Sequence, residues 1–444
     1  MAIPYLHPRA KLLRFGFFYV KKRKSVMNIT GVRGFNDILP QDCEVFRFIE
    51  REAVRVFSSY GFSEIRLPVL EKTELFLRSI GETTDIVEKQ MYTFLDLHGE
   101  SLTLRPEGTA PCVRAYIEKK LYNAPVTRLF YMGPMFRYER PQKGRYRQFY
   151  QIGAEVFGEE SFRVDAEAIE MLSVLFKDLG VDGINIEINS LGCNLCRPGF
   201  KDGLKKFLED KVEALCSNCR RRIGKNPLRA LDCKVEGCIE AAKNAPSILD
   251  FLCGDCKAHF ENFKESLEKA GVGAKVNPRM VRGLDYYTRT AFEVTESAGV
   301  LGSQNAIAAG GRYDGLVEEL GGPKTPCFGF AVGVERLALL IDREKIKKAP
   351  LTFFISMGEE AEKKGPEIAR RLRKEGAGVI LDKSEDSLKG RLRRADRIGA
   401  RYVIIFGEDE VKEGLLTVKD MTTGKQEKLS PDNDKIRLVK LLTA

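Results

Sequence analysis

Apolar residues recur at helical spacing near the start of the chain, at Val45, Phe46, Ile49, Ala53, Val54 and Phe57. This spacing predicts a helix over residues 42–60, and the glycine at position 61 is typical of a helix end. Apolar positions then alternate around Pro68 over residues 65–69, which favours an extended strand. The chain therefore begins with a long helix followed by a strand.

The next 120 or so residues predict a mixed α+β domain. The expected strands are 91–96, 101–104, 127–138 and 147–157, and the expected helices are 109–120 and 164–179. A short polar loop, residues 139–146, joins the two longest strands, so we expect these strands to pair antiparallel.

Residues 192–262 interrupt this pattern with cysteine pairs, basic residues and a helical stretch over 200–215. Strand-like runs at 183–190 and 289–295 flank them, which indicates an insertion within the first domain. The domain then ends in a glycine-rich stretch, residues 310–333, followed by a helix from residue 334 to about 341.

From residue 351 onward, strands alternate with helices, which predicts a separate small α/β domain. The strands are expected at 351–356, 377–381, 401–406 and 415–420, and the helices at 359–375, 386–398 and 431–442. A basic, proline-terminated linker at 345–350 separates the two parts. The predicted domains are thus 27–346, with the insertion 192–262 inside it, and 349–444.

Length and composition agree with a multidomain enzyme, because 444 residues exceed what one hydrophobic core usually holds. No apolar run approaches the roughly 18 residues that a membrane span requires, so we expect no membrane partner.

The formal net charge is +10, but residues 1–26 carry seven basic residues and no acid, and without them the charge is +3. The sum alone is therefore weak support for nucleic-acid binding. The segment 1–26 is either a targeting peptide or a dispensable extension upstream of a start at Met27.

Eight of the eleven cysteines lie between residues 193 and 256. Three pairs have the spacing of a zinc knuckle and one pair is looser, enough for two sites of four thiolates each. They are Cys193, Cys196, Cys216, Cys219, Cys233, Cys238, Cys253 and Cys256. The alternative is a group of buried thiols, since free cysteine packs as a small hydrophobe.

Five basic residues lie on the predicted hairpin of residues 136–151: Arg137, Arg140, Lys143, Arg145 and Arg147. Arginine binds phosphate or carboxylate through two parallel hydrogen bonds, so this hairpin is a candidate anion site. A solvated basic hairpin is the alternative. The chain's three histidines, His7, His98 and His259, lie in no triad-like context, which argues against nucleophilic catalysis.

Together with the returning strand, this hairpin resembles motif 2 of the class II aminoacyl-tRNA synthetases. The resemblance implies that Arg137 holds the α-phosphate of ATP. Residues 329–337, a glycine-rich strand that leads into a helix, resemble motif 3 and imply that Arg336 binds the γ-phosphate, although alone such a segment more often serves packing. The first helix and the strand with Pro68 resemble motif 1, which in that family forms the dimer interface.

Residues 281–294 and 308–322 are similar to the two signature peptides of histidyl-tRNA synthetases. The resemblance implies that Arg282 acts as a cation at the reacting carboxylate and α-phosphate, and that Tyr286 and Tyr287 face the imidazole. Without the signature, two core tyrosines and a surface arginine would be the simpler interpretation.

Residues 103–111 resemble the loop of that family which holds the α-ammonium group of the substrate, and this assigns Glu107 and Thr109 to it. Gln151 and Glu155 complete the predicted pocket; a carboxylate such as Glu155 can pair with an imidazole N–H. Tyr313 is expected to line the same pocket by resemblance. Taken alone, residues 105–109 would be a turn into a helix with the threonine as N-cap.

The last domain resembles the anticodon-binding domain of several class II synthetases. Its basic helix is expected to meet phosphates of the anticodon stem, the alternative being a solvated helix face. The residues are Lys389, Arg391, Arg393, Arg394 and Arg397. Basic residues of the insertion are expected to approach the acceptor stem: Arg220, Arg221, Arg222, Lys225 and Arg229.

The resemblance implies a homodimeric, cytoplasmic enzyme that joins L-histidine to tRNA(His) through histidyl-adenylate, with ATP and Mg²⁺ as the substrate complex. One alternative is a non-catalytic, synthetase-like regulatory subunit of histidine biosynthesis. Such paralogues usually lack the tail domain and have degraded signature peptides, whereas this chain retains both. Another class II synthetase is the third possibility, against which the peptides RGLDYY and GGRYDGL argue.

Overall fold

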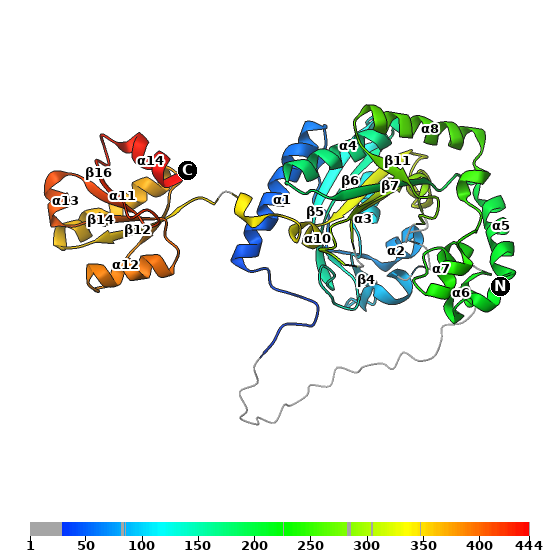
Figure 1. Ribbon diagram of the computed structural model, residues 1–444, viewed down its shortest axis with the longest axis horizontal. Helices are drawn as coiled ribbons and strands as arrows, with labels where there is room; N and C mark the ends of the chain where they lie inside the picture. Colours follow the sequence, from blue (N-terminus) through cyan, green and yellow to red (C-terminus); the bar gives the residue numbers. More distant parts are fainter. Residues whose placement is uncertain are drawn as a thin grey trace, which may run out of the picture. The chain divides into compact units, whose positions relative to one another are not determined.

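The computed structural model describes residues 29–80, 84, 86–224, 226–281, 286–302, 305–346 and 348–443 (Figure 1). The chain divides into two compact units, with the boundary along the sequence between Ile341 and Asp342. The predicted extension 1–26, Lys225 and Arg282 lie outside the described residues.

The first unit is built on an eight-stranded sheet in the order β1-β5-β6-β11-β10-β9-β7-β8. Its strands are β1 Ser63–Glu64, β5 Thr127–Phe136, β6 Gln148–Phe157, β7 Ile184–Ser190, β8 Ala274–Val276, β9 Thr288–Glu296, β10 Ala306–Arg312 and β11 Cys327–Gly333. The six central strands pair antiparallel, and only the short edge strands β1 and β8 run parallel to their neighbours. The predicted antiparallel pairing of the two longest strands, β5 and β6, is confirmed.

Three helices cover one face of this sheet: α1 (Pro40–Ser59), α4 (Phe162–Asp178) and α8 (Gly254–Lys269) (Figure 1). The ring of Phe57 in α1 meets the rings of Phe130 in β5 and Phe330 in β11, on either side of β6, with centroid distances of 5.7 and 5.8 Å. Side chains alternate along each strand, so the residues next to these phenylalanines face the opposite side. That opposite side carries the candidate site.

On the opposite side lie α3 (Thr109–Glu118), α2 (Thr73–Ile80) and a small sheet of β2 (Leu70–Lys72), β4 (Ser101–Leu104) and β3 (Tyr92–Leu95). Helix α2 had no counterpart among the predicted elements. The single strand predicted around Pro68 is wrong: Ile65 N–H bonds to Phe130, after which the chain crosses to the small sheet. The guanidinium group of Arg105 satisfies the carbonyls of Leu67 and Pro68 instead of a neighbouring strand.

The insertion consists of short helices, which Figure 1 shows in green: α5 (Arg197–Glu209), α6 (Ser217–Arg222) and α7 (Glu236–Ala241). It leaves the large sheet after β7 and returns through α8. Among the described residues of the insertion there is no strand.

The second unit is a five-stranded sheet in the order β13-β12-β14-β15-β16, with the first three strands parallel and the last two antiparallel. Its strands are β12 Leu351–Ser356, β13 Gly378–Leu381, β14 Tyr402–Phe406, β15 Leu416–Asp420 and β16 Gln426–Leu429, and its helices are α11 Glu359–Lys374, α12 Leu388–Arg397, α13 Glu408–Glu413 and α14 Lys435–Thr443. Alternate residues of β12 pack on opposite sides, Phe353 toward α12 and Phe354 toward α11. The predicted small α/β domain is confirmed, with β16 and α13 as additional elements. No described helix of the chain is long and apolar enough to cross a membrane.

Candidate active site

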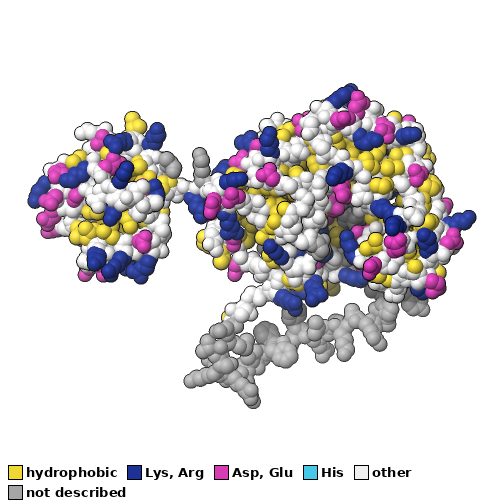
Figure 2. Space-filling model, in the orientation of Figure 1, with side chains coloured by type: hydrophobic (Ala, Val, Ile, Leu, Met, Phe, Trp, Pro, Cys, Tyr) yellow, Lys and Arg dark blue, Asp and Glu magenta, His cyan; other side chains and the backbone are white. Residues whose placement is uncertain are grey.

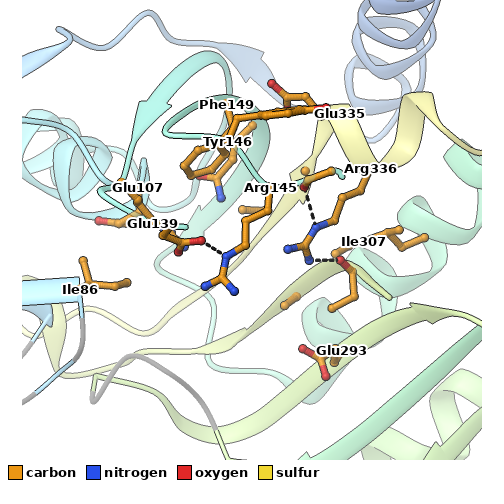
Figure 3. A pocket seen from close by; sticks show the side chains of 18 of the residues that line it. Ile86, Glu107, Glu139, Arg145, Tyr146, Phe149, Glu293, Ile307, Glu335 and Arg336 are labelled. Carbon is orange, nitrogen blue, oxygen red and sulfur yellow. Dashed lines mark hydrogen bonds and ion pairs between the residues drawn. The ribbon is translucent and has the colours of Figure 1, made fainter. Parts of the chain in front are cut away.

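A cavity of about 310 Å³ opens above the centre of the large sheet (Figure 3). Its floor comes from β6, β9, β10 and β11, and its sides come from the loop between β5 and β6, the start of α3 and the first turn of α10 (Val334–Ala338). The volume is at the lower end of the roughly 300–1,000 Å³ typical of small-molecule sites.

Small residues form the floor of this cavity, because the strands that face it carry glycine and alanine at the inward positions. They include Ala309, Ala331 and Gly333. Nearby, Gly329 pairs with Glu155, and a Cβ on that glycine would lie 1.6 Å from the carboxylate oxygen Oε2 of Glu155. The glycine-rich sequence therefore keeps space open both for a ligand and for the buried carboxylate beneath it.

Arg137 follows the last residue of β5 and lines the cavity. Its Nε donates to the carbonyl of Pro106 at 2.7 Å, and its guanidinium carbon lies 5.2 Å from the ring centroid of Phe149. Burial lowers the pKa of the guanidinium, partly offset by Glu107 and the two neighbouring tyrosines. The group remains a fixed cation, and its Nη1 and Nη2 nitrogens are able to bind an anion.

Arg336, in α10, approaches the same space from the other side. Its Nε donates to the carbonyl of Gly144 at 3.1 Å and its Nη1 donates to the carbonyl of Ala306 at 2.6 Å. Figure 3 shows the guanidinium groups of Arg145 and Arg336 extending into one hollow. Burial lowers the pKa of Arg336, and repulsion from Arg145 and Arg137 lowers it further. Three arginines that repel one another, one of them ion-paired with Glu139, favour a ligand with several negative charges in this cavity.

The other end of the cavity offers acceptors. Both oxygens of Glu107 receive backbone N–H groups, from Thr109 at 2.7 Å and Ala110 at 2.8 Å, so this carboxylate lies at the N-terminus of α3. Burial raises its pKa, although the two hydrogen bonds oppose the shift. The alternative in which the threonine caps the helix is wrong, because Thr109 is the first helical residue and its hydroxyl donates to Glu155 at 2.8 Å.

Glu155 lies beneath the cavity floor with no exposed surface. Besides the threonine hydroxyl, it accepts hydrogen bonds from Tyr131 at 3.0 Å and Tyr313 at 2.5 Å. Burial raises the pKa of this carboxyl to about 8, even though the surrounding hydroxyl groups lower it. Neither Glu155 nor Tyr313 lines the cavity itself; both act on it through the residues above them.

Gln151, Tyr286 and Tyr287 complete the wall near Glu107. The oxygen Oε1 of Gln151 is buried and has no hydrogen-bond partner among the described residues. The rings of Tyr286 and Tyr287 lie 4.8 Å apart, and the ring of Tyr286 lies 5.7 Å from that of Tyr313. An unpartnered buried acceptor beside two aromatic rings suits a ligand with a cationic or N–H group.

Of the predicted site residues, seven line the cavity: Glu107, Thr109, Arg137, Gln151, Tyr286, Tyr287 and Arg336. Tyr313 was expected to line it as well but lies with Glu155 behind the lining, and Arg282 lies outside the described residues. Acidic residues that sequence reasoning missed also line the cavity: Glu139, Glu293 and Glu335. Glu335 accepts the backbone N–H of Tyr150, and burial raises its pKa to about 7. The position of Glu335 next to a predicted phosphate-binding arginine was the available signal for it.

In the second unit, basic side chains gather over α12, as Figure 2 shows. Lys389, Arg393 and Arg397 are exposed. Arg391 was expected on the same face and is not there: it is 7% exposed and donates to the carbonyls of Asp386 and Ser356. Its position on α12 faces the sheet, so it serves the fold.

Comparison with known proteins agrees with this geometry. Residues 34–337 match the family described as histidyl-tRNA synthetase, and residues 352–438 match the anticodon-binding domain family. Curated relatives called histidine–tRNA ligase include one from Trichlorobacter lovleyi, 54% identical over 90% of this chain and 96% of its own, and one from Geobacter sulfurreducens, 53% identical over 90% and 96%.

Among solved structures, apo histidyl-tRNA synthetase of S. aureus is similar with a TM-score of 0.76 and 37% identity. The match covers 93% of this chain and 99% of that one. With a family match over most of the first unit and relatives more than half identical over nearly the whole chain, this protein belongs to the histidyl-tRNA synthetases.

Proposed function

We propose that this protein is a histidine–tRNA ligase that uses ATP to join L-histidine to tRNA(His). The observation that carries the proposal is one cavity that is lined by three arginines, by buried acceptors and by aromatic rings. It occurs in a chain whose relatives at more than 50% identity are histidine–tRNA ligases.

The reaction has two steps. A carboxylate oxygen of histidine attacks the α-phosphorus of ATP. The bond between the α-phosphorus and the oxygen that bridges to the β-phosphate breaks, and pyrophosphate leaves with that oxygen. The terminal ribose hydroxyl of tRNA then attacks the carbonyl carbon of histidyl-adenylate, and AMP leaves. Neither step requires a nucleophilic side chain; each requires alignment and positive charge on the phosphates.

The arginines supply that charge. Arg137 is assigned to the α-phosphate and Arg336 to the γ-phosphate. Mg²⁺ enters with ATP as part of the substrate, and it neutralises charge on the leaving pyrophosphate. Arg282 keeps its predicted role at the reacting carboxylate. Arg145, which points into the same space as Arg336, is assigned to the triphosphate as well.

The acceptors are assigned to histidine. The carboxylate of Glu107, the buried oxygen of Gln151 and the hydroxyl of Thr109 surround the place for the α-ammonium group. Tyr286 and Tyr287 face the imidazole, and Glu155 with Tyr313 sets the hydrogen-bond pattern beneath it. A pocket built for N–H groups rejects analogues that lack them, because its buried acceptors would stay unpaired.

The regulatory alternative receives less support from the same observations. A histidine sensor needs the acceptors but not the converging arginines or a tail domain. We therefore assign residues 27–346 to catalysis, with the insertion 192–262, and residues 349–444 to the anticodon stem and loop of tRNA(His). The exposed basic side chains on α12 suit phosphate contacts there.

We further propose a cytoplasmic homodimer. A surface groove beside Pro68 has an apolar part, lined by Ile65, Leu67 and Leu320, and a charged part of both signs that includes Arg66, Glu74 and Arg78. An apolar centre bordered by charged side chains is a common composition of protein interfaces. Sedimentation of the purified protein at micromolar concentration would give twice the chain mass for a dimer, and the single chain mass would contradict it.

Aminoacylation of a tRNA(His) transcript with radiolabelled histidine tests the function. We expect Arg336→Lys to lower kcat/KM for ATP by about a hundredfold, because lysine replaces a fixed fork with a point charge. Arg51→Lys on the exposed face of α1 is the matched control. Equal charging by both variants would contradict the assignment of Arg336, and no charging by the wild type would contradict the function.

A further inference from the structure

The eight cysteines of the insertion form two separate groups, and their pairing is nested along the chain. Cys193 and Cys196 meet Cys253 and Cys256, which we name the basal cluster. The second group, which we name the distal cluster, lies between these pairs in the sequence and contains Cys216, Cys219, Cys233 and Cys238. In each cluster all four sulfur atoms lie within 4.8 Å of one another.

The sulfur separations match those around one tetrahedral ion. A zinc ion bound at about 2.3 Å by four thiolates separates neighbouring sulfurs by about 3.8 Å. In the basal cluster, Cys193 Sγ lies 3.6 Å from Cys196 Sγ and 3.8 Å from Cys253 Sγ. In the distal cluster, Cys216 Sγ lies 3.9 Å from Cys233 Sγ. Two nearly equal distances at Cys193 are expected of shared ligation, whereas a disulfide joins one sulfur to one partner at about 2.05 Å.

Backbone groups point at these sulfur atoms as well. Cys253 N–H donates to Cys196 Sγ at 3.2 Å, and Cys216 N–H donates to Cys238 Sγ at 3.1 Å. Such bonds stabilise a thiolate and orient it as a ligand. Each cluster therefore has both the ligand atoms and the supporting contacts of a structural metal site.

The insertion also needs a cross-link. Its helices α6 and α7 have six residues each, and the cysteines themselves make up much of its apolar core. Hydrophobic burial alone rarely makes a segment of this size without strands stable, and natural small domains are commonly cross-linked by metal ions or disulfides. All-cysteine tetrahedral sites select zinc over Mg²⁺ or Ca²⁺.

The basal cluster is connected to the wall of the cavity. Arg197, the residue after Cys196, donates through Nη2 to the backbone carbonyl of Tyr287. Just before the cluster, the carbonyl of Gly192 accepts the N–H of Arg289 at 2.9 Å, and Leu191 N–H returns a bond to Arg289 at 2.6 Å. The Arg289 backbone has φ of 47°, an unfavourable conformation for a residue with a side chain, so it depends on these bonds.

We propose that each cluster binds one zinc ion and that the zinc of the basal cluster positions the segment carrying Tyr286 and Tyr287 at the histidine end of the cavity. The distal zinc holds only the outer part of the insertion. Arg197 is a positioning residue that transmits the constraint. Zinc binding by the two clusters is the metal half of this proposal, and it does not depend on the proposed function. The positioning of Tyr286 and Tyr287 by the basal zinc is the positioning half, and it rests on the proposed function.

Metal content is measured on the full chain purified under reducing conditions with zinc supplied, by elemental analysis per mole of protein. We expect two zinc ions in the wild type, one in the double variant Cys193→Ser/Cys196→Ser and one in Cys216→Ser/Cys219→Ser. Cobalt in place of zinc should give the absorption of a tetrahedral thiolate site at each cluster. A wild type with no zinc, or with iron in its place, would overturn the metal half.

The positioning half is tested by the KM for histidine in ATP–pyrophosphate exchange. Arg197→Ala keeps all eight cysteines, so we expect two zinc ions and a KM for histidine raised about tenfold, the effect of losing one charged hydrogen bond. The KM for ATP should change little. The distal double variant should match the wild type in both constants, and it controls for general damage to the insertion.

The outcomes separate the two proposals. An unchanged KM for histidine in Arg197→Ala, or an equal rise in the distal double variant, would overturn the positioning half. Absence of exchange with histidine in the wild type would instead contradict the proposed function and leave the zinc count as an independent result.

Discussion

The buried carboxyl of Glu155 makes the stability of this enzyme depend on pH in a way that one substitution should remove. The group has no exposed surface and accepts hydrogen bonds from Thr109, Tyr131 and Tyr313. Burial raises its pKa to about 8, with further repulsion from Glu107. The perturbation is Glu155→Gln, which keeps the shape and one acceptor oxygen but cannot ionise.

The sign and size follow from linkage between proton binding and folding. A carboxyl whose pKa is higher in the folded state binds its proton more tightly there, so stability falls as pH rises from the unfolded pKa to the folded one. The pKa of Glu155 is 4.5 in the unfolded chain and about 8 in the folded protein, so ionising this carboxyl in the folded state lowers the free energy of unfolding by about 5 kcal/mol in full. Between about pH 5.5 and about pH 7.5 the cost grows by about 2.5 kcal/mol. In Glu155→Gln this pH-dependent destabilisation should be absent.

This difference is measured by urea unfolding of both proteins at the two pH values, with the near-ultraviolet signal of the tyrosines as the readout. We expect the free energy of unfolding of the wild type to fall by about 2.5 kcal/mol more than that of Glu155→Gln over this interval. Other titrating groups are common to both proteins and cancel in the difference. Parallel pH dependence in the two proteins would refute the reasoning, because it would mean that Glu155 is ionised at low cost.

Three further predictions concern separate parts of the molecule. Arg312→Ala should lower the free energy of unfolding by about 3–5 kcal/mol in urea titration, because it removes the arginine that pairs with the fully buried carboxylate of Asp165. Gly329→Ala should destabilise by at least about 1–3 kcal/mol and raise the KM for histidine, since its Cβ overlaps a carboxylate oxygen, while Gly315→Ala, with open space at its Cβ, should do neither. Arg393→Glu/Arg397→Glu should raise the KM for tRNA and reduce its salt dependence, with ATP–pyrophosphate exchange unchanged.

Periodicity along the chain was sufficient to predict most elements of the fold. The long helix α1 and the strand pair β5 and β6 carry strong patterns, because one side of each is buried and the other is not. The segment around Pro68 was misassigned because its alternation is real but its carbonyls bond to a side chain, Arg105, that comes from far along the chain. Local pattern cannot reveal such a partner.

The site residues, too, could be predicted where a local motif carries them, and not where their position depends on contacts between distant elements. Resemblance to family motifs predicted Arg137 and Arg336 as site residues, since both lie in recognisable local contexts, and both line the cavity. By contrast, the inward direction of Arg391 depends on which side of α12 meets the sheet, and all the basic residues of that helix look alike in the sequence. The pairing of the cysteines into nested groups is likewise a property of the folded insertion, because spacing alone allows several combinations of the four pairs.

The central claim is that the cavity activates histidine. The most direct test is ATP–pyrophosphate exchange by the wild type with each proteinogenic amino acid in turn, and with Arg137→Ala in parallel. We predict exchange with histidine alone. In the variant the exchange rate should fall about a hundredfold, because positive charge at the α-phosphate is lost. Exchange with a different amino acid, or with none, would contradict the account.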